Sequence, residues 1–184
     1  MPSIFVITGP SGVGKTTVAR ELAKHRLSLR KVITCTTRAP RPGEANDVDY
    51  HFLDLAAFGR LIESGGMFEF GYHYGNLYGS RTADVESLTA QGYDVLFVVD
   101  VDGAVSIRRD HPEAVVIFLD AESTSELIAR MEARDHGTTA GRADRVAAIE
   151  RERAYGTTCD HRVVNTEGQL DITVATIDRI MENR

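Results

Sequence analysis

Short apolar runs alternate with amphipathic segments along most of this chain. Continuous apolar runs occur at residues 3–8, 95–99 and 114–119, and a shorter one lies at 162–164. Runs of this length without polar alternation are typical of parallel strands that are buried on both faces. Because these runs alternate with helical patterns, the sequence predicts an α/β fold with a parallel sheet covered by helices.

Three helices are predicted from spacing and capping signals. The first begins near Lys15, directly after a glycine-rich turn. The second follows Ser123, with Glu126 three residues later as in a capping box. The third spans about residues 169–182 and places an apolar stripe on one face, formed by Leu170, Val174, Ile177 and Met181.

Two segments interrupt the alternation of strands and helices. Residues 34–88 carry two prolines, several glycines and most of the aromatic residues, which favours an inserted, partly β subdomain with a helix near residues 55–63. Residues 135–141 are polar and glycine-bounded, which is typical of a mobile lid. We therefore expect one domain over residues 1–184, with its core at 1–33, 89–126 and 158–184, an insertion at 34–88 and a lid at 127–157.

Composition narrows the class of protein. The 184 residues are 42% hydrophobic and 26% charged, as expected for a globular chain of one domain. The net charge of -6 argues against a nucleic-acid coat or a membrane-surface protein. No apolar run approaches the roughly 20 residues that span a bilayer, and no signal peptide is recognisable, so we expect a cytoplasmic protein. Cys35 and Cys159 show no metal-ligand spacing and are expected to be reduced.

The strongest chemical signal is a phosphate-binding loop between the first strand and the first helix. Gly9, Gly14, Lys15 and Thr16 meet the spacing G-x-x-x-x-G-K-[ST]. Glycines let the backbone point several N–H groups at one phosphate, and the helix N-terminus adds its positive dipole. A lysine and a hydroxyl at these positions suit the β- and γ-phosphates and Mg²⁺ respectively. The loop predicts ATP and Mg²⁺ as ligands but leaves the phosphoryl acceptor open.

Two further features point to phosphate and metal chemistry. Arg38 and Arg41 lie three residues apart on a proline-stiffened segment, and two guanidinium forks suit a phosphate monoester. Asp100 ends an apolar run, as in a Walker B strand whose carboxylate lies near Mg²⁺. An isolated Arg-x-x-Arg is more often a solvated turn, so its neighbourhood has to decide the assignment.

Over almost its whole length the chain resembles the guanylate kinase family, whose members transfer phosphate from ATP to GMP. The resemblance rests on order and spacing of several segments together: residues 9–16, residues 36–44 with Asp49 and Tyr50, Phe68 and Glu69, residues 75–80, Asp100, Gly103, Arg130, Arg134, Arg145, and Val164 with Asn165. It implies a P-loop NTPase-type core with an acceptor-nucleotide insertion and a lid, and the reaction ATP + GMP = ADP + GDP.

The resemblance also implies roles for individual residues. The ATP side would comprise Gly9, Ser11, Gly12, Val13, Gly14, Lys15, Thr16, Thr17 and Asn165. The GMP phosphate would be held by Arg38, Arg41, Tyr50 and Tyr78, and the guanine would be read by Glu69 and Ser80, helped by Thr34 and Asp100. Lys15, Arg130, Arg134 and Arg145 would stabilise the transferring phosphoryl group, and Thr16 and Asp100 are the candidate metal ligands.

Guanine chemistry agrees with these roles. Its N1–H and amino group lie on one edge, where a carboxylate can accept from both, and O6 beside them can accept from a hydroxyl. Adenine lacks the N1 proton and carries an amino group where guanine has O6. The sequence therefore favours GMP over AMP as acceptor and leaves dGMP open.

Some positions depart from the family pattern and keep alternatives open. Val98 and Asp102 stand where an acid and a glutamine are common, Thr34 replaces a serine, and Thr166 stands where an acid often follows. Asp100 remains open between a metal ligand and a purine reader. The alternative functions are a kinase for a phosphorylated sugar, such as ribose bisphosphate, and a non-catalytic interaction module. Oligomeric state stays undetermined.

Overall fold

The computed structural model describes residues 2–73, 75–135 and 142–184. Within these ranges the side chains of residues 134, 135, 142, 144 and 145 are not described. The expected lid centre at 136–141 therefore lies outside the described residues.

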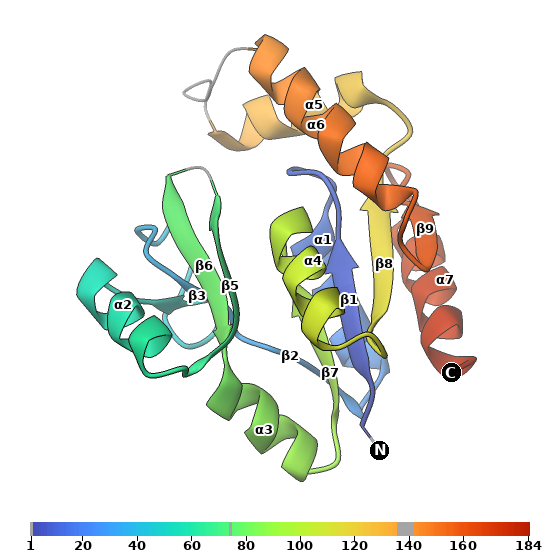
Figure 1. The fold of residues 1–184 in the computed structure, drawn as a ribbon. Helices are drawn as coiled ribbons and strands as arrows, with labels where there is room; N and C mark the ends of the chain where they lie inside the picture. Colours follow the sequence, from blue (N-terminus) through green and yellow to red (C-terminus); the bar gives the residue numbers. More distant parts are fainter. Residues whose placement is uncertain (1, 74, 136–141) are drawn as a thin grey trace.

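The core is a five-stranded parallel sheet in the order β2-β7-β1-β8-β9 (Figure 1). Its strands are β1 Ile4–Thr8, β2 Leu29–Lys31, β7 Asp94–Val98, β8 Val115–Asp120 and β9 His161–Val164. The helices α1 Lys15–His25, α4 Val101–Asp110 and α7 Leu170–Glu182 connect or follow these strands. The predicted parallel α/β core is confirmed. Because all five strands are parallel, their carboxyl ends meet at one edge of the sheet.

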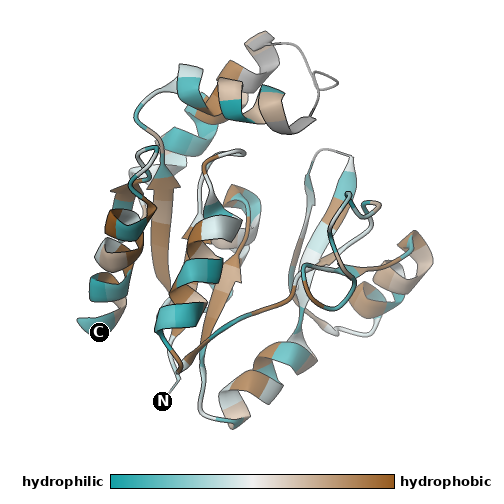
Figure 2. Cartoon of the chain, turned by 180° about the vertical axis from the view of Figure 1, so that it is seen from behind, coloured by the Kyte–Doolittle hydropathy of each residue, from teal (hydrophilic) through white to brown (hydrophobic). Residues whose placement is uncertain are grey.

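Alternate residues of the central strands supply two apolar cores. Phe5 and Ile7 belong to the core that packs against α1 and α7, whereas Val6 packs on the opposite face with residues of α4. The hydropathy view agrees, since the central strands are mostly brown and the helices carry teal outward faces (Figure 2). Every residue of β8 is buried, as expected from the unbroken apolar run that precedes Asp120 at its end.

One strand differs from its predicted environment. The run at residues 162–164 was expected to be buried on both faces, but in β9 only Val163 is buried and Val164 is 45% exposed. The reason is its place in the sheet, because β9 is an edge strand with a neighbour on one side only. Position in the sheet is a long-range property that a four-residue pattern does not contain.

A second, four-stranded sheet lies beside the core, in the order β4-β3-β6-β5 (Figure 1). It is formed by β3 Cys35–Thr36, β4 His51–Phe52, β5 Met67–His73 and β6 Asn76–Arg81. Two helices accompany it, α2 Leu55–Glu63 at the predicted position and α3 Thr82–Ala90. Because α4 packs on β5 and α3 contacts both β6 and β7, the two sheets are joined through shared helices.

The helices α5 Thr124–Asp135 and α6 Arg142–Gly156 cover the carboxyl edge of the core sheet (Figure 1). Ser123 Oγ accepts a hydrogen bond from Glu126 N (3.1 Å), as the capping signal predicted. The Glu126 carboxylate pairs with Arg130 one turn later.

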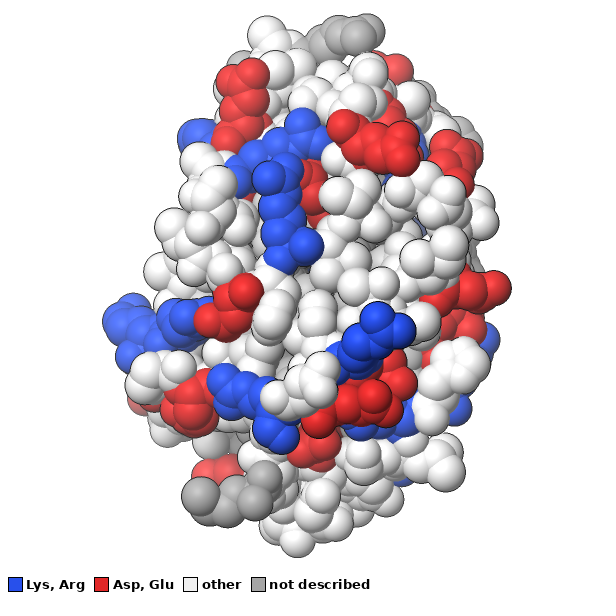
Figure 3. Space-filling model, turned by 90° about the vertical axis from the view of Figure 1, so that its right-hand side faces the viewer, with Lys and Arg blue, Asp and Glu red and all other residues white. Residues whose placement is uncertain are grey.

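Acidic and basic side chains lie side by side on the face drawn in Figure 3, and neither sign covers that face continuously. Within the described ranges, no helix is long and apolar enough to cross a membrane. Both cysteines are free, and burial raises the pKa of the Cys35 thiol to about 11. Such a thiol remains protonated at neutral pH.

Candidate active site

The phosphate-binding loop joins β1 to α1 at the carboxyl edge of the core sheet. Gly9, Gly12 and Gly14 all have positive φ, at 142°, 82° and 99°. A Cβ atom on Gly9 would lie 2.0 Å from the Leu119 carbonyl oxygen, so only glycine fits there. Gly14 precedes α1, and among the described residues no side chain caps this helix N-terminus. Its first N–H groups are thus available to an anion.

Lys15 lies across this loop. Its Nζ donates to the carbonyl oxygens of Gly9 (2.6 Å) and Pro10 (3.0 Å). These bonds hold the ammonium beside the backbone N–H groups of the phosphate-binding loop. There it would neutralise the charge of a phosphate bound to the loop. Thr16 and Thr17, in the first turn of α1, are both exposed.

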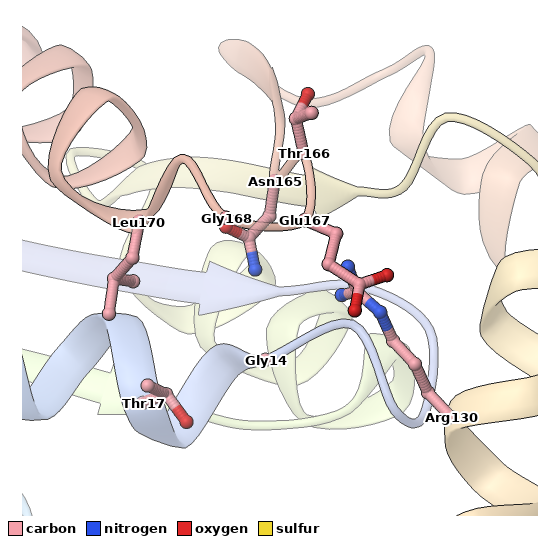
Figure 4. Close-up of a pocket in the computed structure, with 8 residues that line it drawn as sticks. All are labelled: Gly14, Thr17, Arg130, Asn165, Thr166, Glu167, Gly168 and Leu170. Atoms are coloured by element: carbon pink, nitrogen blue, oxygen red, sulfur yellow. The ribbon is translucent and has the colours of Figure 1, made fainter.

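A pocket of about 230 Å³ opens beside the start of α1 (Figure 4). Its lining comprises Gly14, Thr17, Arg130, Asn165, Thr166, Glu167, Gly168 and Leu170. Asn165 Nδ2 donates to the Val13 carbonyl (2.8 Å), and its Oδ1 accepts from Thr173 (3.0 Å). The Asn165 amide therefore fixes the phosphate-binding loop. Glu167 and Arg130 point toward one another across the pocket (Figure 4).

A larger cleft of about 1140 Å³ lies between the loop and the second sheet. It brings together most of the predicted site residues: Ser11, Gly12, Gly14, Lys15, Thr16, Thr17, Thr34, Arg38, Arg41, Tyr50, Glu69, Tyr78, Asp100 and Arg130. Gly9, Val13 and Ser80 are buried and do not line this cleft, and Asn165 lines the smaller pocket. The side chains of Arg134 and Arg145 lie outside the described part of the chain, so their places remain predictions.

One end of the cleft is built around Arg38. Its two terminal nitrogens donate to the two carboxylate oxygens of Glu44, both at 2.9 Å. Arg41 contributes its backbone N–H to the same carboxylate (2.7 Å). The Arg38 guanidinium also lies 5.3 Å from the ring centroid of Tyr50, whose ring contacts Tyr78 edge-on. A forked anion is thus already bound at this end, and a carboxylate presents the same bidentate geometry as a phosphate.

The other end of the cleft carries a buried acid. Glu69 is 5% exposed and Ser80 is fully buried, and Ser80 Oγ donates to Glu69 Oε1 (2.8 Å). The register of β5 and β6 pairs these two residues directly. Burial raises the pKa of Glu69 to about 7, against the hydrogen bond from Ser80, and the nearby Asp100 raises it further. Burial has removed water that would stabilise the ionised carboxylate. Hydrogen-bond donors of a bound ligand would replace that water.

Asp100 has a structural role that the sequence did not indicate. β7 ends at Val98, two residues earlier than the Walker B pattern suggested, and Asp100 is the N-cap of α4. Its Oδ1 accepts from Gly103 N (2.8 Å), while Oδ2 lies 3.4 Å from His73 Nδ1. One carboxylate oxygen is thus committed to the helix, and the other faces the cleft.

Sequence reasoning missed three residues of this region. Glu44 forms an ion pair with Arg38, and His73 at the end of β5 contacts Asp100. The third residue is Glu152 on α6, whose pKa is raised by burial to about 7. Lys15 acts in the opposite direction on the Glu152 carboxyl, and Asp100 adds to the rise. Glu44 could have been found from its place beside the two arginines. His73 and Glu152 carry no local signal, since their approach depends on the tertiary fold.

A phosphate-binding loop at the carboxyl edge of a parallel sheet, beside an arginine-lined cleft, defines a nucleotide-binding protein of the P-loop class. Comparison with known proteins agrees. The family model described as guanylate kinase matches residues 1–184. A guanylate kinase of Bordetella pertussis is 36% identical over 171 residues, covering 93% of this chain and 80% of the relative.

Other relatives give the same result. A guanylate kinase of Thermus thermophilus is 41% identical over 162 residues, covering 88% of this chain and 72% of its own length. The crystal structure of guanylate kinase from Anaplasma phagocytophilum matches with a TM-score of 0.80 at 27% identity, covering 99% of this chain and 85% of that one. The chain therefore belongs to the guanylate kinase family, which makes it a nucleoside monophosphate kinase.

Proposed function

We propose that the protein transfers the γ-phosphoryl group of ATP to the phosphate of GMP, giving ADP and GDP. The observation that supports this best is the buried Glu69–Ser80 pair, which shares one cleft with the phosphate-binding loop. A carboxylate that accepts from N1–H and the amino group of guanine has no such donors on adenine. The pair therefore favours a guanine base at this end of the cleft.

The phosphates of the two substrates would meet between the loop and Arg38. The loop N–H groups and Lys15 would bind the β- and γ-phosphates of ATP, and its adenine would enter the pocket beside Asn165. The GMP phosphate would displace the Glu44 carboxylate from Arg38, or share the guanidinium with it, alongside Arg41, Tyr50 and Tyr78. This arrangement holds donor and acceptor phosphates in one cleft, which converts the transfer into a step between positioned groups.

Charge on the transferring phosphoryl group would be offset by cations of the loop and of the lid helices. Lys15 supports this from the loop, and Arg130 from α5. Arg134 and Arg145 are proposed to join them from α5 and α6. Mg²⁺ would be held by the Thr16 hydroxyl and the phosphate oxygens, with Asp100 on the cleft wall, because oxygen donors of this kind suit that ion. When bound, the ion supplies further neutralisation of the phosphate charges.

The reaction is tested by ADP formation from ATP and Mg²⁺ with each nucleoside monophosphate in turn, and with ribose bisphosphate as acceptor. We expect GMP to be turned over, with AMP at least about a hundredfold poorer in kcat/KM, because two charge-assisted hydrogen bonds are lost. dGMP in the same panel defines whether the ribose hydroxyl contributes. Preference for ribose bisphosphate over GMP would overturn the proposal.

The loop assignment is tested by Lys15→Met. Its ammonium offsets charge that develops during transfer, so kcat should fall by at least about a hundredfold. Lys24→Met, at the exposed far end of α1, is the matched control and should keep its activity. Circular dichroism should report the same helix content in both variants. Near-normal turnover in Lys15→Met would remove the loop from the mechanism.

A further inference from the structure

Asp47 has an unusual backbone conformation. It is the single non-glycine residue with positive φ in the described ranges, at 61°. This left-handed conformation is tolerated by aspartate but still costs energy, so it persists where surrounding contacts hold it. Three contacts hold it here. Asp47 N–H donates to the Tyr50 carbonyl (2.9 Å), Asn46 Nδ2 donates to Asp47 Oδ2 (2.9 Å), and Asp47 Oδ1 forms a 2.5 Å hydrogen bond with His51 Nδ1.

His51 connects Asp47 to Arg81, a residue of β6 in the second sheet. Its buried ring lies between Asp47 and Arg81, with 2.6 Å from Nε2 to an Arg81 terminal nitrogen. Asp84 Oδ2 also lies 3.3 Å from Nε2, but the arginine nitrogen is closer and has no acceptor capacity. We therefore assign Nε2 as the acceptor from Arg81 and Nδ1 as the donor to Asp47. Arg81 in turn donates to both carboxylate oxygens of Asp84, at 2.7 and 3.0 Å.

The two central members of this network each follow a candidate ligand of GMP. His51 directly follows Tyr50 at the phosphate end of the cleft, and Arg81 directly follows Ser80 at the base end. Their strands, β4 and β6, are not neighbours, because β3 lies between them. The His51–Arg81 hydrogen bond therefore crosses β3 and links the two ends of the acceptor site.

We propose that Asp47, His51, Arg81 and Asp84 are positioning residues that set the separation between the phosphate-binding and base-reading parts of the acceptor site. They control GMP affinity without contacting GMP. The proposal rests on the GMP site proposed above. A displacement of one part relative to the other would leave the nucleotide able to satisfy its phosphate or its base, but not both at full strength.

The decisive variant is Asp47→Gly, because it removes the carboxylate and the backbone strain together. Glycine adopts a φ of 61° without steric strain. This gain offsets part of the lost hydrogen bonds, so the melting temperature should fall by no more than about 4 °C. Loss of one hydrogen bond of the network should nevertheless raise the KM and the dissociation constant for GMP about tenfold, with the KM for ATP unchanged. Asp47→Asn keeps both an acceptor oxygen and tolerance of this conformation, so its GMP KM should stay within about twofold of the native value.

Arg81→Met tests the network from its other side and should also raise the GMP KM about tenfold. Both substitutions interrupt the same series of contacts. The GMP KM of the double variant Asp47→Gly/Arg81→Met should therefore be no higher than that of either single variant. Arg60→Met, exposed on α2 of the same subdomain, is the matched control and should leave both KM values unchanged.

Arg38→Lys separates failure of this proposal from failure of the GMP site. If it raises the GMP KM while Asp47→Gly and Arg81→Met do not, the positioning network is wrong and the acceptor site stands. A native protein that does not phosphorylate GMP would instead overturn the function itself. Equal losses for ATP and GMP in the network variants would assign these residues to general stability and would also overturn the proposal.

Discussion

At the scale of single residues, we expect Glu69 to make the affinity of the cleft for GMP depend on pH. Burial raises the pKa of its carboxyl to about 7 in the free protein. GMP needs the ionised form as acceptor of two hydrogen bonds, so we expect the GMP KM to rise as pH falls below about 7, by up to tenfold per pH unit. Steady-state KM values for GMP between pH 5.5 and 8.5, at about saturating ATP, would measure this.

Glu69→Gln is the control for that pH profile. GMP carries its own phosphate ionisation near pH 6, and this contribution is shared by the native protein and the variant. The ratio of their KM values should therefore isolate the Glu69 carboxyl, and a constant ratio across pH would contradict the assignment.

The Glu69 carboxyl affects the stability of the free protein in the opposite direction. Because its pKa is raised from 4.5 to about 7, the free protein loses stability as pH rises through that interval.

Residue-level prediction from sequence worked where the chemistry is local. Gly9, Gly14 and Lys15 lie in one short loop, so their spacing alone indicated a phosphate-binding loop. The positive φ values of the two glycines agree with this prediction. The pairing of Glu69 with Ser80 depends on the register of β5 and β6. That register was not readable from the pattern, and only the family resemblance pointed to these two residues.

At the scale of elements, the strand patterns located the sheet but not its edges. The unbroken apolar run of β8 predicted a buried strand correctly, whereas the run in β9 looked the same and forms an edge. Likewise, the apolar residues before Asp100 continue past the end of β7, because a following N-cap also begins in extended conformation. A local pattern shows neither the edge position of β9 nor the end of β7. Both are set by the hydrogen bonds to a neighbouring strand, which lies far away in the sequence.

The position of α6 depends on a buried carboxylate at the end of β8. Asp120 has no exposed surface and accepts from Arg153 Nε (2.9 Å) and an Arg162 terminal nitrogen (2.5 Å). Arg153 also donates to Thr124 (2.8 Å) and to the Ala121 carbonyl (2.9 Å), so one side chain joins α6 to the start of α5. The two helices joined in this way, α5 and α6, are those that carry Arg130, Arg134 and Arg145.

Removing Arg153 should therefore cost more stability than removing Arg162. The Arg153 side chain is 23% exposed and Arg162 is 50% exposed. Arg153→Met leaves Asp120 with one partly solvated partner, and we expect the free energy of unfolding to fall by about 3 kcal/mol, near the lower end for a broken buried ion pair. Arg162→Met should cost about 1 kcal/mol. Urea denaturation of both variants would measure this, and equal losses would contradict a joint centred on α6.

At the scale of the whole molecule, shared helices join the two sheets, and we expect the sheets to fold as one unit. α3 contacts β5, β6 and β7, and α4 packs against both β5 and β1, so neither sheet is covered without helices that also serve the other. The acceptor cleft is lined from both sheets, from Lys15 of the core to Glu69 of the second sheet. A ligand in that cleft therefore makes contacts that exist only when both sheets are folded and adjacent.

This arrangement predicts how substrates change thermal unfolding. The protein should unfold in one cooperative transition, and GMP should move that whole transition upward, because binding is confined to the native state. At about a hundred times its dissociation constant, GMP adds about 2.7 kcal/mol, or about 5–10 °C for a domain of this size. AMP at the same concentration should give a much smaller shift, and Glu69→Gln should lose most of the GMP response. Differential scanning calorimetry would measure these shifts. Two separate transitions, with only one responding to GMP, would show that the second sheet unfolds on its own and would contradict a single unit joined by α3 and α4.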